Sequence, residues 1–216
     1  MNETEVLIRV EDFARSSTVE FDSGHDWWHL QRVRNLALYL QKSENKGDRF
    51  VIELSALLHD VGDSKFKKAA GPGADSIISD LLKDCGLAEN IITEVIRINK
   101  YISFSNKGTL KNRSVEFDIV QDADRLDAIG AIGIARAFNY GGFKNNAIFI
   151  PENGKSSKRP STILHFYEKL LLLKDMMNTH TAVVLALERH SILKEFLVNF
   201  YKEWYFPVKP DQPDVQ

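Results

Sequence analysis

The stretch Ala-Leu-Leu-His-Asp-Val-Gly-Asp-Ser-Lys-Phe at residues 56–66 is the one around which the rest of the chain is organised. Apolar residues at helical spacing lead into the adjacent pair His59 and Asp60, and a glycine, a second carboxylate and a lysine follow. An imidazole and a carboxylate are costly to bury at the end of an apolar helix unless they are paired or bind a metal ion. Together they suit borderline divalent ions such as Mn, Fe, Co, Ni and Zn. The alternative is a core histidine with its hydrogen bonds satisfied, followed by solvated aspartates. The rest of the sequence is needed to choose between these two interpretations.

The composition is that of a protein with one substantial hydrophobic core. Among 216 residues, 44% are apolar and 10% aromatic, and we expect one domain over residues 1–206 with a proline-containing tail at 207–216. With a net charge of −2, the sequence lacks the excess of basic residues that is typical of proteins that bind nucleic acid. The single cysteine, Cys85, excludes an internal disulfide and fits a reducing compartment. The acidic N-terminus and the lack of an apolar run of roughly 18 residues predict a cytoplasmic protein without a signal peptide or membrane span.

Helical periodicity runs through almost the whole chain, so the expected fold class is all-α. After a first amphipathic helix marked by Val6, Val10 and Phe13, we expect helices at about 25–42, 48–59, 75–83, 88–99, 113–138, 161–178 and 179–205. The run Asp-Ser-Gly at 22–24 supplies N-cap candidates for the second of these helices.

A long polar loop over 141–160 interrupts the helical pattern. It holds three glycines and two prolines, and its Lys155, Lys158 and Arg159 are basic. Loops of this length inside a compact domain are usually lids, binding loops or disordered segments. One expectation is a mobile cover whose cations meet substrate phosphates, and the other is a plain solvated loop.

Two further stretches carry side chains suited to a metal or to acid–base chemistry. His25 and His29 are four residues apart and share a helix face. Such a pair binds zinc in metalloproteases, but no glutamate follows His25, so that reaction class is not supported. Downstream, Asp122, Asp124 and Asp127 fall within six positions among apolar residues. Asp124 and Asp127 share a face, and some of these carboxylates must therefore lie close to the core.

The order of these residues resembles the ligand set of the HD-domain metal-dependent phosphohydrolase superfamily. Three stretches are similar to one bacterial and fungal subgroup, namely His-Asp-x-x-His-x-x-Arg-Val at 25–33, Leu-His-Asp-x-x-Asp-x-Lys at 58–65 and Gln-Asp-Ala-Asp-Arg-Leu-Asp at 121–127. The runs His-Phe-Tyr-Glu-Lys-Leu at 165–170 and Met-Asn-Thr at 177–179 also resemble that subgroup, and the resemblance spans about residues 20–205. It implies a single helical bundle with one divalent ion (Mn, Co, Ni, Fe, Mg or Zn) on His29, His59, Asp60 and Asp124.

The resemblance also implies two catalytic roles. Asp63 lies three residues past Asp60, where related nucleotidases carry an acidic residue that handles the attacking water. Lys65 is expected to pair with the negative charge of a phosphate. The alternatives are that Asp63 is a solvated carboxylate at a helix end and that Lys65 is an ordinary surface lysine.

Four more residues are candidates for supporting roles. Asp127 is expected to hold a ligand histidine by its free ring nitrogen, a usual role for a carboxylate near a metal. His25 is expected either to contact the ligands or to face phosphate, and a histidine of purely local use at the helix start is the alternative. Arg32 is expected to bind an anion or to pair with the acidic cluster. Lys169 shares a helix face with His165, although packing of the histidine beside an exposed lysine is the favoured explanation of that pair.

The expected activity is hydrolysis of a phosphate ester or anhydride in a small substrate, most simply a nucleotide. Relatives in this superfamily either split nucleoside triphosphates into monophosphate and pyrophosphate or act as 5'-nucleotidases on monophosphates. The alternative is a catalytically silent HD-type module that senses a nucleotide. The sequence leaves the oligomeric state open, a homo-oligomer included.

Overall fold

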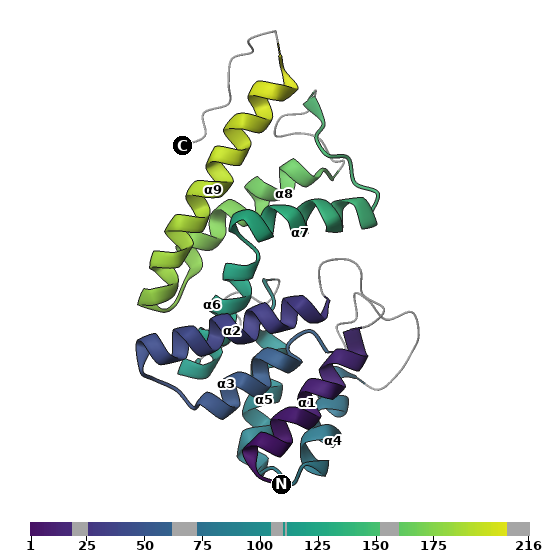
Figure 1. Ribbon diagram of the computed structural model, residues 1–216, viewed down its shortest axis with the longest axis vertical. Coiled ribbons are helices and arrows are strands. Elements are labelled where there is room, and N and C mark those ends of the chain that lie inside the picture. Colours follow the sequence, from purple (N-terminus) through teal and green to yellow (C-terminus); the bar gives the residue numbers. More distant parts are fainter. Residues whose placement is uncertain (19–25, 62–72, 105–109, 111, 152–159, 207–216) are drawn as a thin grey trace. The chain divides into compact units, whose positions relative to one another are not determined.

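The computed structural model describes residues 1–18, 26–61, 73–104, 110, 112–151 and 160–206, and within these ranges the expected all-α class is confirmed. Helices make up the described chain, and the only pairing of β type in it is an isolated parallel bridge between Ala147 and Ser161. In chain order the helices are α1 (Glu3–Thr18), α2 (Trp27–Glu44), α3 (Arg49–Leu58), α4 (Ala74–Asp84), α5 (Glu89–Tyr101), α6 (Val115–Asp127), α7 (Gly130–Phe143), α8 (Thr162–Glu168), the 3-10 helix η3 (Leu170–Met176) and α9 (His180–Trp204) (Figure 1). None of the described helices is long and apolar enough to cross a membrane.

The chain forms two compact units, and each is described by itself. The first comprises Met1–Asp124 together with Asn178–Thr181, and the second comprises Arg125–Met177 and the chain from Ala182 onward. The division into one domain and a tail stays a prediction, and the tail at 207–216 lies outside the described residues.

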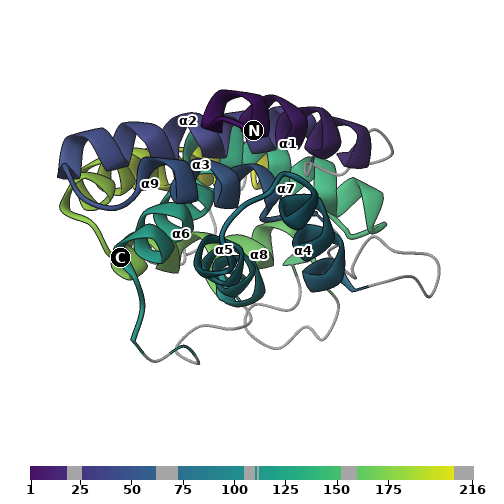
Figure 2. The ribbon, with the colours of Figure 1, turned by 90° about the horizontal axis from the view of Figure 1, so that it is seen from below.

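The core of the first unit is built around α3. Every residue from Phe50 to Leu58 is buried, which is the pattern of a helix enclosed on all sides. The helix packs against α1, α2 and α5, and Figure 2 shows it beneath α1 and α2 with α5 on its other side. Its start is set by Asp48, whose carboxylate accepts hydrogen bonds from the N–H groups of Phe50 and Val51 at 2.8 and 3.3 Å. A fixed start and a fully buried length place the C-cap residue, His59, at the edge of the core.

The start of α2 corrects one prediction. The cap candidates at 22–24 lie outside the described residues, and the observed N-cap is Asp26. Its carboxylate accepts a hydrogen bond from the N–H of His29 at 2.8 Å, which is the usual contact of an N-cap side chain with the third residue of a helix. The helix therefore begins at Trp27 and carries His29 in its first turn.

The single helix expected over 113–138 is wrong, because the chain divides it into α6 and α7. The break lies at Gly130, which adopts a positive φ of 77° that disfavours other residues. A Cβ there would also lie 3.0 Å from Cγ of Arg189 on α9. As a result α6 ends soon after Asp124, and α7 runs to Phe143, into the segment expected to be a loop.

The second unit packs α7, α8 and α9 around aromatic rings. Phe138 of α7, Phe166 of α8 and Phe196 of α9 lie with ring centroids 5.6 to 6.0 Å apart, the usual separation of packed aromatic pairs. At Gly141, a Cβ would meet Oγ1 of Thr162 at 2.2 Å, so glycine is what permits this close approach of α7 and α8.

A buried carboxylate anchors the returning chain in the first unit. Asp122 is fully buried on α6, and its oxygens accept hydrogen bonds from the backbone N–H of Asn178 at 2.9 Å and of Thr179 at 2.7 Å. The Asn178 amide and the Thr179 hydroxyl donate to the same carboxylate at 2.9 Å each. Thr181, two residues after Thr179, donates side-chain and backbone hydrogen bonds to Glu44, and these lower the pKa of that carboxyl group. The Asn-Thr pair in the sequence is thus a partner for Asp122.

Replacing Asp122 by Ala should lower the free energy of unfolding by about 3 kcal/mol or more, because four donors would lose an ionised acceptor in a buried place. For a chain of this size, that loss corresponds to a fall in thermal midpoint of roughly 6 to 12 °C in scanning calorimetry. The matched control is Asp80→Ala, an exposed carboxylate on α4, which should stay within about 0.5 kcal/mol of the parent protein. Equal midpoints for Asp122→Ala and the parent would contradict the anchor.

Candidate metal centre

The end of α3 fixes the tautomer of His59. Its Nδ1 lies 2.8 Å from the carbonyl oxygen of Ala56, one turn earlier in the helix. A carbonyl oxygen only accepts hydrogen bonds, so Nδ1 must carry the proton and donate it. The other ring nitrogen, Nε2, is then left with its lone pair, which is the form in which a neutral imidazole binds a metal ion.

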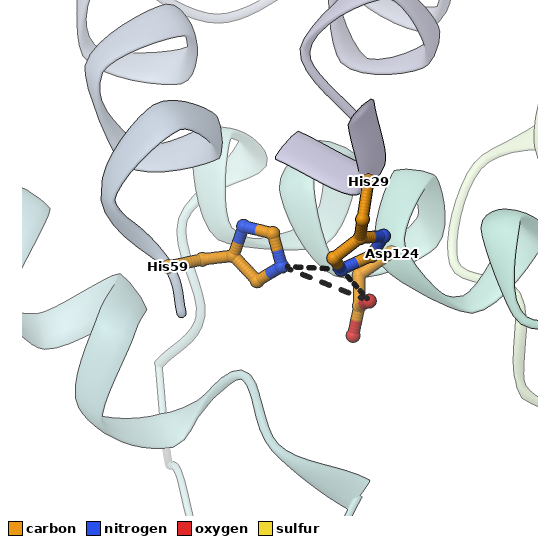
Figure 3. A group of neighbouring side chains, drawn as sticks. All are labelled: His29, His59 and Asp124. Carbon is orange, nitrogen blue, oxygen red and sulfur yellow. Dashed lines mark hydrogen bonds and ion pairs between the residues drawn. The ribbon is translucent and has the colours of Figure 1, made fainter. Parts of the chain in front are cut away.

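The second histidine faces the first across the core of this unit. His29 is fully buried in the first turn of α2, and its Nε2 lies 3.1 Å from Nε2 of His59. The two rings meet edge to face with an interplanar angle of 75°, so their nitrogens point at one place and the rings do not stack (Figure 3).

Two carboxylates approach the same place. Asp60, which follows α3, has Oδ2 at 3.2 Å from Nε2 of His29 and 3.6 Å from Nε2 of His59. Asp124, on α6, has Oδ1 at 3.6 and 3.8 Å from the same two nitrogens. The ligand atoms of His29, His59 and Asp124 all lie within 4.8 Å of one another (Figure 3). Residues far apart in the sequence therefore converge from three helices.

The spacing of these atoms fits a divalent ion. Ligand atoms at about 2.1 Å from an ion lie about 3.0 Å apart around an octahedron and about 3.4 Å apart around a tetrahedron. The separations that involve the two histidine nitrogens, from 3.1 to 3.8 Å, fall at or slightly above these values. Two imidazole nitrogens and two carboxylate oxygens form a donor set that Mn, Fe, Co, Ni and Zn accept.

The side chains of the cluster differ in their exposure to solvent. The side chains of the two histidines are enclosed, whereas those of Asp60 and Asp124 are 14% and 31% exposed. Solvent can therefore reach the cluster from the carboxylate side. Bound to a six-coordinate ion, these side chains would leave positions open, as in a catalytic site and not in a closed structural one.

Several predicted site residues lie outside the described part of the chain. These are His25, Asp63 and Lys65, together with the three loop cations Lys155, Lys158 and Arg159. Their roles stay predictions.

The remaining candidates have observed surroundings. Asp127 belongs to the second unit, where its Oδ2 accepts a hydrogen bond from Nη1 of Arg136 at 2.9 Å. Lys169 also lies there, at the end of α8, and burial, with a smaller contribution from Lys169, lowers the pKa of His165 to about 4. His165 is thus neutral at pH 7. The expected roles of Asp127 and Lys169 at a metal or substrate stay predictions, as does that of Arg32 on α2.

Sequence reasoning missed the role of Asp122. The sequence analysis placed Asp124 among the expected ligands but gave Asp122 no role, and in the structure Asp122 serves the Asn178–Thr179 anchor while Asp124 joins the histidines. The Met-Asn-Thr run at 177–179 was the available signal, because asparagine and threonine side chains readily donate to a carboxylate.

Comparisons with known proteins agree with this geometry. The family model of the HD domain matches residues 27–129, a span that contains all four converging residues. The chain is 39% identical to the Bacillus subtilis protein YpgQ over 205 residues, which cover 94% of this chain and 96% of that one. It is 32% identical to protein L803 of Acanthamoeba polyphaga mimivirus over 173 residues, covering 74% and 68% of the two chains.

Solved structures extend the likeness to the fold. A crystal structure of Bacillus subtilis YpgQ in complex with ADP superposes with a TM-score of 0.76 at 37% identity, over 93% of this chain and 98% of that one. An HD-superfamily hydrolase from Bacillus thuringiensis gives a TM-score of 0.73 at 39% identity, over 94% and 98% of the two chains. The resemblance predicted from the motifs is confirmed, and the chain belongs to the HD-domain superfamily.

Proposed function

We propose that this protein is a metal-dependent phosphohydrolase that cleaves a phosphate ester or anhydride in a nucleotide. The observation that carries the proposal is the convergence of His29, His59, Asp60 and Asp124 with their carboxylates toward solvent. The nucleotide is supported by the structure of Bacillus subtilis YpgQ, which was crystallised with ADP.

Together these four residues would hold one divalent ion. When bound, such an ion polarises a phosphoryl oxygen and makes a water molecule more acidic. The two histidines supply neutral donors, and the carboxylates of Asp60 and Asp124 supply two negative charges that balance those of the ion. Because the ligand set cancels the positive charge, the negative charge of a substrate phosphate has to be met by other cations. Lys65 is our candidate for that contact.

Asp63 is proposed to accept the proton of the attacking water. Its place three residues after Asp60 supports the assignment, because three residues of chain span at most about 10 Å. The water oxygen then attacks phosphorus, and the bond from phosphorus to the leaving oxygen breaks. With a triphosphate the products are a nucleoside monophosphate and pyrophosphate, and with a monophosphate they are a nucleoside and phosphate.

A release assay separates these reactions from each other and from the alternative of a silent nucleotide sensor. The purified protein would be incubated with nucleoside mono-, di- and triphosphates in the presence of Mn, Co, Ni, Mg or Zn, and phosphate and pyrophosphate would be measured separately. We expect one product to dominate with at least one metal. Absence of both products under every condition, with nucleotide binding retained, would favour the sensor.

Replacing His59 or Asp60 by Ala should remove bound metal and hydrolysis together, because each change deletes one of four ligands. Metal content would be measured by elemental analysis and folding by circular dichroism on the same sample. His180→Ala is the matched control, since His180 is exposed at the start of α9, and it should keep its metal. Stoichiometric metal in a folded Asp60→Ala protein would show that Asp60 is not a ligand.

Replacing Asp63 by Asn should leave the metal content nearly unchanged but lower turnover by about 10²-fold or more, the usual scale for loss of a general base. The amide keeps the shape of the side chain but has neither its charge nor its basicity. Turnover within a fewfold of the parent protein would reduce Asp63 to a solvated carboxylate. Asp122 would not replace it as a candidate, because its oxygens are occupied by Asn178 and Thr179.

A further inference from the structure

A charged pair lies inside the helix pair that brings the two histidines together. Glu53 is the only acidic residue of the enclosed helix α3, and it is 4% exposed. Its Oε1 accepts a hydrogen bond from Nε of Arg34 on α2 at 2.8 Å, and Nη2 of the same guanidinium donates to that oxygen as well. A carboxylate is costly to bury unless it is paired, and α2 supplies the partner.

Arg34 is the cation that ties Glu53 to a neighbouring helix. Its remaining nitrogen, Nη1, donates to Glu11 of α1 at 3.0 Å, so the guanidinium joins three helices. Nε of Arg49 lies 3.9 Å from Oε2 of Glu53, but the Arg49 side chain is 71% exposed and belongs to α3 itself. Of the two cations beside Glu53, only Arg34 therefore fixes α3 against another helix.

The charged pair and the two histidines lie at matching heights along α2 and α3. Arg34 comes five residues after His29, and Glu53 comes six residues before His59. At the rise of an α-helix these intervals are about 7.5 and 9 Å. Because the start of α2 meets the end of α3, the two helices run antiparallel, and they lie side by side in Figure 2. A slide of α3 along α2 would therefore disturb both contacts together.

Apolar packing alone holds this register less tightly than a metal site requires. Burial of apolar side chains is non-directional, and repacked cores lose uniqueness before they lose stability. Metal ligands, by contrast, have to be held within about 0.5 Å of their working geometry. Charge-assisted hydrogen bonds are short and weaken steeply when their angle is wrong, so the ion pair supplies the directional restraint that apolar contacts lack.

We propose that Arg34 and Glu53 are positioning residues, whose ion pair sets the register of α2 against α3. Through that register the pair holds Nε2 of His29 and Nε2 of His59 at the short separation that a shared metal ion needs. The inference rests on the proposed function in taking the two histidines as metal ligands. The charged pair itself acts through the helices that carry them.

The test is the full-length double variant Arg34→Met with Glu53→Leu. Replacing a buried ion pair by apolar residues of similar size often leaves stability unchanged or raises it, so the thermal midpoint should equal or exceed that of the parent protein. Affinity for Mn²⁺ and Zn²⁺, measured by calorimetric titration of the chelator-treated protein, should nevertheless fall about tenfold to a hundredfold, the range for residues that orient metal ligands. A pair that served stability alone would not separate the two measurements.

A second readout needs no metal. In the chelator-treated parent protein, the facing rings of His29 and His59 should give a nuclear Overhauser contact, and the double variant should lose it. If the parent protein bound neither ion, the function proposed above would fail, whereas the ring contact would still decide whether the charged pair sets the register.

The matched control is Arg9→Met with Asp84→Leu, which removes an exposed ion pair of 3.5 Å between α1 and α4. It should leave the metal affinity and the ring contact unchanged. A folded Arg34→Met and Glu53→Leu protein that kept the metal affinity and the ring contact of the parent would overturn the proposal.

Arg34→Lys takes the place of the double variant if that protein does not fold. The lysine keeps a positive charge beside Glu53 but holds it from one nitrogen on a flexible stem, so metal binding should weaken by at least about threefold. Metal affinity equal to that of the parent protein in Arg34→Lys would then overturn the proposal.

Discussion

Two imidazole nitrogens that face each other at 3.1 Å in a buried place are the constraint on which the site depends. The hydrogen bond from Nδ1 of His59 to Ala56 leaves a lone pair directed at His29, and two such lone pairs repel unless a proton or a cation lies between them. The carboxylates of Asp60 and Asp124 lie within 3.8 Å of both nitrogens and favour positive charge at the same point. The cluster is therefore suited to a cation, and the ligand atoms of His29, His59 and Asp124 lie close enough together to hold a metal ion.

The fold supplies this arrangement by fixing helices in place. Because α3 is enclosed along its whole length, it cannot rotate or slide without exposing apolar residues, so His59 has little freedom of position. The N-cap of Asp26 fixes the first turn of α2, and the Asp122 carboxylate ties α6 to the segment after η3. His29, His59 and Asp124 are thus positioned by interactions that lie outside the cluster itself. That division is what a precise metal site requires.

The sequence by itself determined the all-α class, most helix positions and the identity of the converging residues. Periodic apolar spacing reports burial of a helix face, and an adjacent His-Asp pair at the end of such a helix has few uses in a core. Only the tertiary structure decided the break at Gly130, which depends on the approach of Arg189 from a helix far along the chain. It alone also showed what Asp122 does, because the partners of a buried carboxylate depend on what packs against its helix. The reason is the same in both cases: local patterns encode which residues are buried, whereas partners from distant segments decide what each buried polar group does.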